Sequence, residues 1–276
     1  EKSNINDVIN FWEQNPLWTG ESKYTPNDKE FYEEHNEVYR DDVFAGNINN
    51  EIFASVKNKN NKILDLGCGA GYWLGQFASK GFTNLYGADI TKNALNITKK
   101  RLDYKNYKAI LSIQNAERTT FENEFFDHVN CQGVIHHTPQ PENCIKEIHR
   151  ILSKNGTAVI SVYYKNFILN NWSYIYWLGK ILYKTGGGLL GRGREKIFLE
   201  KDPNEIVRLY DGGDNPIGKA YSKNEFIKRL DPYFKINQSF LHFFPARSLP
   251  MKIPKKIHKI LNNHLGFMII CILEKK

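Results

Sequence analysis

The sequence predicts an α/β fold, in which a mostly parallel sheet has helices on both faces. Two observations carry this prediction. Between residues 62 and 163, short apolar strands alternate with helical segments, as in sheets whose parallel strands are joined through helices. The strand expected at 157–163 is a continuous apolar run, which is typical of a parallel strand buried on both faces. With 276 residues, of which 41% are hydrophobic, the chain can form one large domain with insertions.

The expected elements begin with helices and continue with the alternating region. Amphipathic patterns predict helices over 5–15, around 31–39 and over 43–56. The strands of the alternating region are then expected at 62–66, 84–89, 109–114, 126–131 and 157–163. Helices are expected at 71–79, after Thr91, and at 141–152. Thr91 is expected to cap the second of these helices, and Asn155-Gly156 to end the third.

Residues 165–220 interrupt the alternation. An aromatic helix is expected over 167–183, a glycine-rich stretch over 185–193 and another helix over 199–210. Because glycine loses the most backbone entropy on ordering, residues 185–194 are expected to be mobile without ligand and to become protected when product and acceptor bind. The core pattern then resumes, with a helix at 222–230 and strands at 235–243 and 267–273.

A glycine-rich turn connects the first strand to its helix. It contains Gly67, Gly69 and Gly71, and the next strand ends in Asp89. Glycines let a ligand approach the backbone closely, and a carboxylate about 20 residues later can bind both hydroxyls of a ribose. The pair of features therefore predicts a cofactor that contains adenosine.

The spacing of this turn disfavours a dinucleotide. The dinucleotide fingerprint needs a third small residue where the helix packs on the strand, and counting from Gly67 that position is Tyr72. Asp65 precedes the first glycine, where its charge would repel a pyrophosphate and attract an ammonium or sulfonium group.

From Lys62 to Tyr163 the sequence resembles the class I methyltransferases, which bind S-adenosylmethionine. The resemblance rests on the segments 64–71, 87–89, 115–117, 126–127, 133–137, 147–152 and 155–156. It implies a Rossmann-like, seven-stranded, mostly parallel sheet whose final strand is antiparallel. It also implies an enzyme that transfers a methyl group to an oxygen, nitrogen or carbon atom of a small-molecule acceptor and releases S-adenosylhomocysteine. The motifs are specific for the class and do not identify the acceptor.

The same resemblance assigns cofactor-binding residues, which share positions at the ends of the first four strands. Asp65 would lie near the ammonium group, Asp89 would hold the ribose hydroxyls, and Ile90 would pack on adenine. Asn115 stands where the family often has aspartate. The remaining assignments are the turn residues Gly67, Cys68, Gly69 and Gly71 for the methionine part, Ala116 and Glu117 beside Asn115 at the adenine edge, and Gln132 and Gly133 beside the sulfonium.

Candidate catalytic residues follow the fourth strand and the interruption. His136 and His137 lie at the edge of the sheet where ligands bind, and a histidine can take a proton from a nucleophile near neutral pH. The alternative is that one of them caps a helix or packs against the cofactor. Tyr210 belongs to a polar cluster with Asp211, Asp214 and Asn215 that could orient an acceptor, or could be ordinary turn chemistry. Tyr163, Tyr164 and Tyr221 are further candidates near the cofactor.

These assignments divide the chain into four parts. We expect an N-terminal helical cap at 1–60, a cofactor-binding core at 61–164 and a substrate cap or lid at 165–220. Residues 221–276 would complete the core sheet, with a short insertion at 245–265.

The net charge of +8 permits an anionic partner without selecting one. We see no RNA-binding module, so nucleic acid is not the expected partner, although an RNA or protein methyltransferase stays an alternative. The aromatic segment 172–182 is followed by Lys184, Arg192 and Arg194. It could rest on an anionic membrane, which would suit a lipid-like acceptor, or it could form the substrate lid. The oligomeric state is left open.

Cysteine usage indicates a reducing compartment. The four cysteines, Cys68, Cys131, Cys144 and Cys271, show no C-x-x-C spacing, so we expect free thiols in a cytoplasmic protein. No metal site is expected. The sequence has no apolar run of 18 residues and no basic-then-apolar pattern at its start, so neither a spanning helix nor a signal peptide is expected.

Overall fold

The computed structural model describes residues 3–46, 48–186, 189–191, 194, 196–249 and 251–276. In this part of the chain, one eight-stranded sheet runs in the order β3-β2-β1-β4-β5-β8-β7, and β6 pairs with β5 off this path. The strands are β1 (Ile63–Leu66), β2 (Leu85–Asp89), β3 (Ile110–Ile113), β4 (Phe126–Gln132), β5 (Leu152–Tyr164), β6 (Ala220–Tyr221), β7 (Phe234–His242) and β8 (Met268–Lys275).

The seven strands of the main path confirm the predicted Rossmann-like arrangement. β1 pairs in parallel with both β2 and β4, and the strand order reverses at this point. The last strand, β8, runs antiparallel to both of its neighbours, β5 and β7. The two-residue β6 is the one addition to the predicted seven strands.

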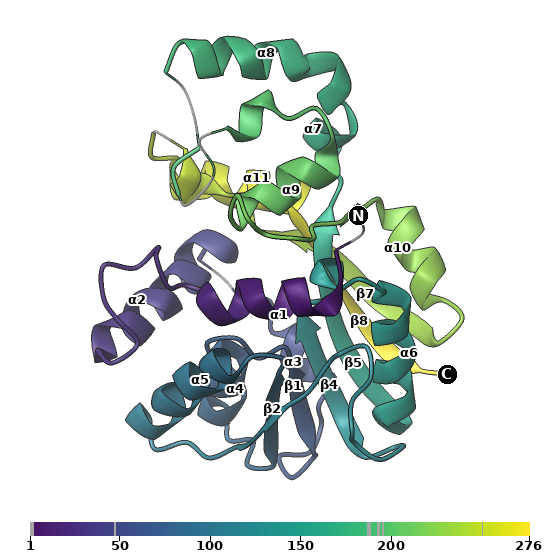
Figure 1. Cartoon of the computed structure of the whole chain (residues 1–276). Helices are drawn as coiled ribbons and strands as arrows, with labels where there is room; N and C mark the ends of the chain where they lie inside the picture. The colour runs from purple at the N-terminus through teal and green to yellow at the C-terminus, as the bar shows by residue number, and fades with distance from the viewer. Residues whose placement is uncertain (1–2, 47, 187–188, 192–193, 195, 250) are drawn as a thin grey trace.

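Helices cover both faces of this sheet (Figure 1). The core helices are α3 (Glu51–Ala54), α4 (Tyr72–Ser79), α5 (Lys92–Tyr104), α6 (Pro141–Ile151) and α10 (Lys223–Leu230). Adjacent residues of β1 point to opposite faces, as expected in a strand. Ile63 packs in a cluster with α3, α4 and α5, whereas Leu64 packs in a cluster with α6 and α10.

Two groups of helices lie beyond the carboxyl ends of the strands. The first contains α1 (Ile5–Gln14), α2 (Lys29–Val38) and a short π-helix, η1 (Tyr39–Val43). The second contains α7 (Phe167–Asn170), α8 (Trp172–Lys184), η3 (Ile197–Leu199), α9 (Pro203–Tyr210), η4 (Ala246–Ser248) and α11 (Lys255–Leu265); the remaining short helix is η2 (Ile135–His137). In Figure 1, α1 lies between the sheet and the helices α9 and α11.

Three of the expected helices differ in the structure. The helix expected over 43–56 is interrupted because Ala45 and Gly46 adopt positive φ angles of 49° and 90°, which no right-handed helix contains. The helix expected over 167–183 is divided at Asn171 into α7 and α8. The helix expected over 199–210 starts only at Pro203, at the first helical position that proline favours.

The Asn155-Gly156 pair does not end a helix. α6 ends at Ile151 and β5 begins at once, so the pair lies inside the strand. Asn155 has φ 60°, and the pairing of β4 with β5 shifts register between Phe126 and His128. The turn signal in the sequence therefore marks an irregularity in β5.

In the part of the chain that the structure describes, none of the helices has the length and apolar character needed to cross a membrane.

Candidate active site

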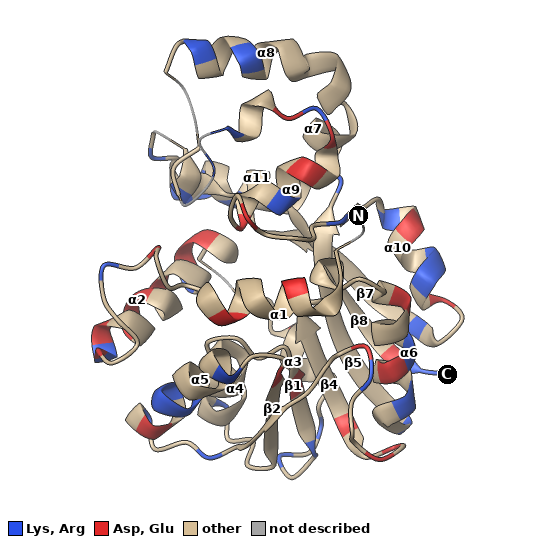
Figure 2. Cartoon of the chain, viewed as in Figure 1, with Lys and Arg blue, Asp and Glu red and all other residues tan. Residues whose placement is uncertain are grey.

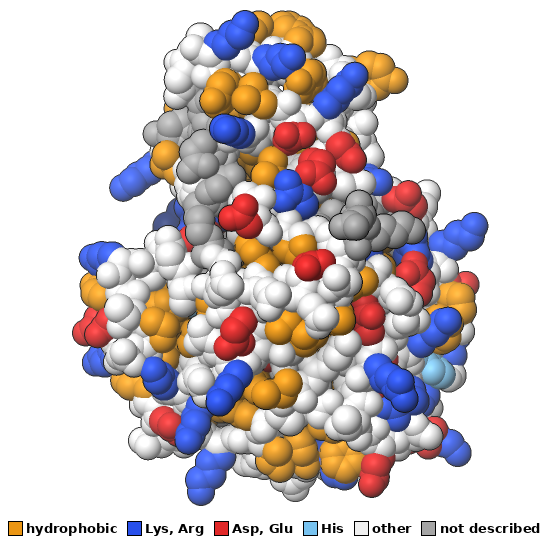
Figure 3. All heavy atoms as spheres, viewed as in Figure 1, with side chains coloured by type: hydrophobic (Ala, Val, Ile, Leu, Met, Phe, Trp, Pro, Cys, Tyr) orange, Lys and Arg blue, Asp and Glu red, His pale blue; other side chains and the backbone are white. Residues whose placement is uncertain are grey.

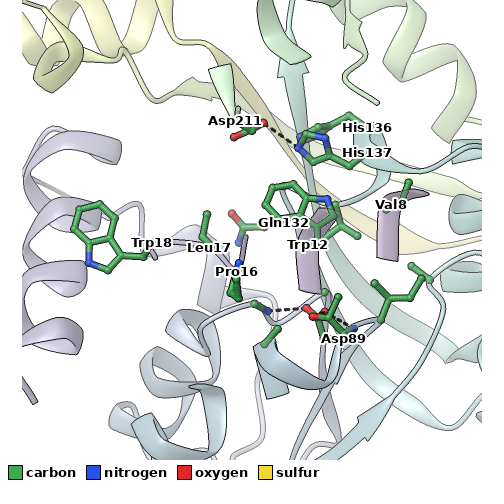
Figure 4. Close-up of a pocket in the computed structure, with 18 of the residues that line it drawn as sticks. Val8, Trp12, Pro16, Leu17, Trp18, Asp89, Gln132, His136, His137 and Asp211 are labelled. Carbon is green, nitrogen blue, oxygen red and sulfur yellow. Dashed lines mark hydrogen bonds and ion pairs between the residues drawn. The ribbon is translucent and has the colours of Figure 1, made fainter. Parts of the chain in front are cut away.

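A cavity of about 250 Å³ lies at the carboxyl ends of the strands, beside the point where the strand order reverses. This is where open α/β sheets bind ligands. The predicted residues in its wall are Gly67, Gly69, Asp89, Ile90, Asn115, Ala116, Gln132, Gly133, His136, His137, Tyr163, Tyr210 and Asp211. Figure 4 shows Asp89 at one side of this cavity, Asp211 at the other and Gln132 between them.

The glycine turn brings backbone to the cavity wall. Gly67, Gly69 and Gly71 have φ angles of 77°, 52° and 73°, which favour glycine. A Cβ atom on Gly67 would lie 2.2 Å from Val134 Cγ2, so a side chain does not fit there. Gly71 instead packs against Thr98, and the Cys68 thiol also faces Thr98 inside the core. Cys68 and Gly71 thus lie behind the wall, and their contact with a cofactor stays a prediction.

Asp89 is held by three hydrogen bonds that fix its carboxylate in the cavity wall. Oδ2 accepts from the Gly69 N–H at 3.0 Å, and Oδ1 accepts from the Thr91 N–H at 3.0 Å and from its hydroxyl at 2.9 Å. Burial raises the pKa of Asp89, and these donors oppose that shift. Thr91 does precede α5, but its side chain makes no cap hydrogen bond and instead binds Asp89. Thr91 thus lies at the N-cap position that the sequence predicts, but its side chain binds Asp89 and does not cap α5.

Asp65 is connected to the cavity through two other side chains. Its Oδ1 accepts from Asn130 Nδ2 at 2.7 Å, and Asn130 Oδ1 accepts from Gln132 Nε2 at 2.7 Å. Gln132 is the member of this chain that lines the cavity. Asp65 Oδ2 is buried without a hydrogen-bond partner among the described residues. Burial, together with the nearby charge of Asp89, raises the pKa of Asp65 to about 7, although the hydrogen bond from Asn130 opposes the shift.

The predicted adenine edge is formed around Asn115. Its side-chain oxygen accepts from the Glu117 N–H at 2.9 Å, which makes a tight turn. The Glu117 carboxylate faces away and accepts from the Gln140 N–H at 2.6 Å, so Glu117 lies outside the wall. Gln114, which the sequence did not single out, lines the cavity and is fixed by Thr120.

Across the cavity, His137 joins a hydrogen-bonded group with Asp211 and Tyr163, and Figure 4 shows His137 facing Asp211. His137 Nδ1 lies 2.7 Å from the Ile217 carbonyl oxygen, so this nitrogen carries a proton. Its Nε2 lies 3.2 Å from Asp211 Oδ2, and the same oxygen accepts from the Tyr163 hydroxyl at 2.6 Å. Nε2 of His137 and Oδ2 of Asp211 are therefore close enough to share a hydrogen.

His136 differs from its neighbour. Its Nδ1 is buried without a partner among the described residues, and burial holds its pKa well below the ordinary value. The ring packs between His137 and Tyr163, with centroids 4.2 Å from each. His136 is therefore neutral, and its packed ring forms part of the cavity wall.

Tyr210 is also a wall residue in this structure. Burial raises its pKa to about 12, and its hydroxyl lies 3.2 Å from Ser248 Oγ. The guanidinium of Arg194 lies over its ring, 3.9 Å from the centroid. Arg194, Arg247 and Glu21 line the same region, and sequence reasoning did not select Arg247 or Glu21 because they lie 226 residues apart.

The described residues contain no group of three or more His, Cys, Asp or Glu side chains placed to hold a metal ion.

Comparison with known proteins places the central region in a family. A methyltransferase-domain model matches residues 64–160. Phosphoethanolamine N-methyltransferase 2 of Caenorhabditis elegans is 31% identical over 106 residues, which are 38% of this chain and 24% of that protein. A ubiquinone biosynthesis O-methyltransferase of Coxiella burnetii is 25% identical over 155 residues, which are 56% of this chain and 63% of that protein. The chain thus spans less than two thirds of the length of these relatives.

Solved structures agree on the fold. A SAM-dependent methyltransferase of Methanosarcina mazei superposes with a TM-score of 0.54 at 20% identity, over 81% of this chain and 96% of that chain. Residues 64–160 therefore form a methyltransferase domain, and the chain has the fold of S-adenosylmethionine-dependent methyltransferases. The [4+2]-cyclase SpnF also superposes, with a TM-score of 0.52 at 11% identity over 98% of this chain and 93% of that chain. The fold of this methyltransferase family is therefore compatible with more than one reaction.

The cavity of this methyltransferase domain fits S-adenosylmethionine. Because a Cβ on Gly67 would collide with Val134, this position has no side chain and its backbone lines the cavity. A carboxylate can accept about four hydrogen bonds, and the three that fix Asp89 leave capacity for a ribose hydroxyl. The buried, unpaired oxygen of Asp65 would gain from a positive charge nearby.

Proposed function

We propose that this protein transfers a methyl group from S-adenosylmethionine to a nucleophilic oxygen, nitrogen or carbon atom of a small-molecule acceptor. One observation carries the proposal: a single cavity contains both the glycine turn with Asp89 and the group His137–Asp211–Tyr163. The cofactor-binding residues and a proton acceptor thus face the same space. The names of the relatives, which act on an amine and on oxygen, support methyl transfer and leave the acceptor open.

The chain's own residues would bind the cofactor, accept a proton, and align the reactants away from water. When bound, S-adenosylmethionine supplies a methyl group attached to a positively charged sulfur atom. Asp89 and the turn at Gly67 and Gly69 would hold the cofactor, and Gln132 and Gly133 would flank the reacting centre. For an O–H or N–H acceptor, the Asp211–His137 pair would take up the proton at its bridging position. The other contribution is alignment of the nucleophile and exclusion of water.

The caps would control access to this cavity. Val8 and Trp12 of α1 line it, and Trp12 packs edge-on against His137 with centroids 5.2 Å apart. We therefore propose that residues 1–60 and 165–220 form caps around the acceptor. Of the stretch expected to be mobile, residues 187–188 and 192–193 lie outside the described residues. Leu190 and Arg194 in it are hydrogen-bonded to Ser248 and Tyr210.

Two measurements test the proposed function. Calorimetry should show that S-adenosylhomocysteine binds the full chain, whereas NAD gives no comparable heat. A panel of small-molecule acceptors should then yield S-adenosylhomocysteine with at least one compound. Bulk tRNA and a basic protein in the same panel test the RNA and protein alternatives. Absence of cofactor binding would refute the proposal, and cofactor binding without transfer to any acceptor would favour another reaction on this fold.

A second candidate function, methylation at a membrane surface, is favoured by the outer face of α8. Trp172 and Gly179 are buried, whereas the opposite side is exposed, with Tyr174 at 78%, Trp177 at 58% and Ile181 at 51%. Leu178 and Leu182 continue this stripe. α8 also contains Lys180 and Lys184 and no acidic residue. Figure 2 shows basic and no acidic positions along α8, and Figure 3 shows Lys or Arg side chains among hydrophobic ones at the top of the molecule.

The nearby helix α11 has the same character, with three lysines, no acidic residue and exposed Ile257 and Ile260. Apolar residues flanked by lysines suit an anionic lipid surface better than a neutral one. We therefore propose that this end of the molecule rests on anionic membranes and receives a lipid-like acceptor there. A cytoplasmic location would agree with the four free, buried cysteines and is likewise a proposal.

Vesicle sedimentation tests the membrane candidate. The protein should sediment with vesicles that contain phosphatidylserine and not with pure phosphatidylcholine, and Ile181→Asp should abolish the difference. The matched control is Ile110→Asp, because Ile110 is 59% exposed but lies on the edge strand β3. Concentration-dependent dimerisation without vesicle binding would instead make this face a subunit interface and refute the membrane candidate.

A further inference from the structure

Two arginines flank one carboxylate in the wall of the cavity. Glu21 Oε1 accepts from Arg194 Nη2 at 2.7 Å, and Glu21 Oε2 accepts from Arg247 Nη2. All three side chains line the cavity. Arg194 packs on Tyr210, which adjoins Asp211 in the chain, and Asp211 lies across the cavity from Asp89 in Figure 4. The arrangement has the form of a carboxylate bound between two guanidinium groups.

The arginines are the fixed partners in this arrangement. Arg194 is only 3% exposed and donates to the carbonyl oxygens of Tyr210 and Leu190 and to the Ser248 hydroxyl. The backbone N–H of Arg247 donates to Asp42 at 2.9 Å, and its guanidinium Nε lies 3.4 Å from the same carboxylate. None of these contacts involves Glu21. Both guanidinium groups would therefore keep their places if Glu21 moved.

Glu21 is the replaceable partner. It lies in the segment 15–28 that connects α1 to α2, outside regular helix. Its backbone N–H makes a turn hydrogen bond to the Trp18 carbonyl oxygen at 3.3 Å, and Leu17, four residues earlier in the same segment, is exposed. A carboxylate on such a segment can leave for solvent at a lower cost than a buried arginine can. Arg247 would still pair with Asp42, 3.4 Å from its Nε, but removing Glu21 without a substitute would leave the buried Arg194 guanidinium without an ion-pair partner among the described residues, so another anion is expected to take its place.

We propose that Arg194 and Arg247 bind an anionic group of the acceptor, a carboxylate or a phosphate, and that Glu21 occupies this anion site until the acceptor enters. The inference rests on the methyl transfer proposed above and adds the class of its acceptor. The exchange of one anion for another keeps the charges paired, and it couples acceptor binding to displacement of the segment 15–28. The carboxylate of the cofactor has the same chemistry, so the test must separate these two sources.

Inorganic phosphate is the probe for the anion site. It is titrated into the full chain saturated with S-adenosylhomocysteine, at constant ionic strength. Glu21→Gln removes the internal competitor, so phosphate should bind this variant about tenfold more tightly than the unmodified protein, or more. Adding Arg247→Gln to Glu21→Gln should remove that gain. Unchanged affinity for S-adenosylhomocysteine shows that the variants are folded.

Glu205→Gln is the matched control, because Glu205 pairs with Arg208 at 2.8 Å in α9 but neither residue lines the cavity. It should leave phosphate binding unchanged. Equal phosphate affinity in the unmodified protein, Glu21→Gln and the double variant would overturn the anion site.

The source of the anion is separated with two adenosine ligands. S-adenosylhomocysteine contains a carboxylate, and 5′-methylthioadenosine does not. Arg247→Gln should leave the ratio of their affinities unchanged if the arginines serve the acceptor. A loss of about tenfold or more for S-adenosylhomocysteine alone would assign the arginines to the cofactor and overturn the proposal. Failure of the unmodified protein to bind either ligand would instead refute the methyl transfer function.

Discussion

The two sides of the cavity are built in different ways. On the side of Asp89, backbone groups of consecutive turns form the wall, its charged side chain Asp89 is acidic, and a second carboxyl, Asp65, lies behind Gln132. On the side of Asp211, the wall consists of side chains from separate caps, and they include Arg194 and Arg247. Acidic groups suit a ligand with positive centres, whereas arginines suit an anion. The difference indicates that one side is fitted to a cofactor common to the family and the other to a particular acceptor.

The largest expected effect concerns proton transfer on the Asp211 side. Replacing His137 by Ala should lower turnover by about 100-fold or more, because the pair that receives the acceptor proton is lost. Asp211→Asn should have a similar effect, and neither change should alter the affinity for S-adenosylhomocysteine. Initial rates with an acceptor found in the panel provide the measurement.

The control for this comparison is His149→Ala, because His149 lies on α6 outside the cavity wall. Turnover within a few-fold of the unmodified protein for both His137→Ala and Asp211→Asn would mean that alignment alone drives the reaction.

The next effect concerns the cofactor side. Asp89→Ala should weaken S-adenosylmethionine binding by roughly 10- to 100-fold, about 1–3 kcal/mol, since a buried carboxylate that accepts from ribose is removed. Calorimetry gives the affinity. Asp103→Ala is the control, because this exposed carboxylate lies on α5 outside the wall. An unchanged affinity in Asp89→Ala would show that the ribose binds elsewhere.

The cofactor side should also respond to pH. Because burial raises the pKa of Asp65 to about 7, this carboxyl is about half protonated at neutral pH. A positive ligand group nearby favours the ionised form and lowers the pKa, so binding should release protons at pH 7. Affinity for S-adenosylhomocysteine should therefore rise about tenfold from pH 6 to pH 8.

Calorimetry at pH 7 in buffers of different ionisation enthalpy measures this proton release. Asp65→Asn should abolish it. If the unmodified protein shows the same binding heat in every buffer, the positive group does not influence Asp65 through Asn130 and Gln132.

The cofactor side was accessible from the sequence because its residues are local. Asp65, the glycine turn and Asp89 occupy consecutive strand ends, and parallel strands bring such ends together. The structure adds what spacing does not determine: two hydrogen bonds, through Asn130 and Gln132, connect Asp65 to the cavity, and Glu117 faces away. The direction of a side chain at the end of a strand depends on its packing against residues elsewhere in the chain, which a short sequence motif does not specify.

The Asp211 side could be predicted only in part. His137 and Asp211 were candidates because of their residue types, but their 3.2 Å contact depends on how the segment after α9 folds back over the sheet. The Glu21 pair with Arg247 joins opposite ends of the chain. No periodicity or spacing indicates such a contact, since the caps are not part of the repeated strand and helix pattern.

The smallest expected effect separates two roles of Thr91. The sequence suggests a helix cap, whereas the structure shows its hydroxyl donating to Asp89 Oδ1 at 2.9 Å with no cap hydrogen bond to α5. If Thr91 positions Asp89, Thr91→Val should weaken S-adenosylhomocysteine binding by about three- to fivefold, since one neutral-to-charged hydrogen bond is lost while the backbone donor remains. If it caps the helix, the change should instead lower the free energy of unfolding by about 1 kcal/mol and leave binding unchanged. Calorimetry and urea unfolding on the same variant distinguish these outcomes.

Thr25→Val is the control, because Thr25 also donates to an aspartate, Asp28, but at the exposed start of α2. Loss of stability without loss of affinity would mean that the cofactor side depends on Asp89 and its backbone donors alone.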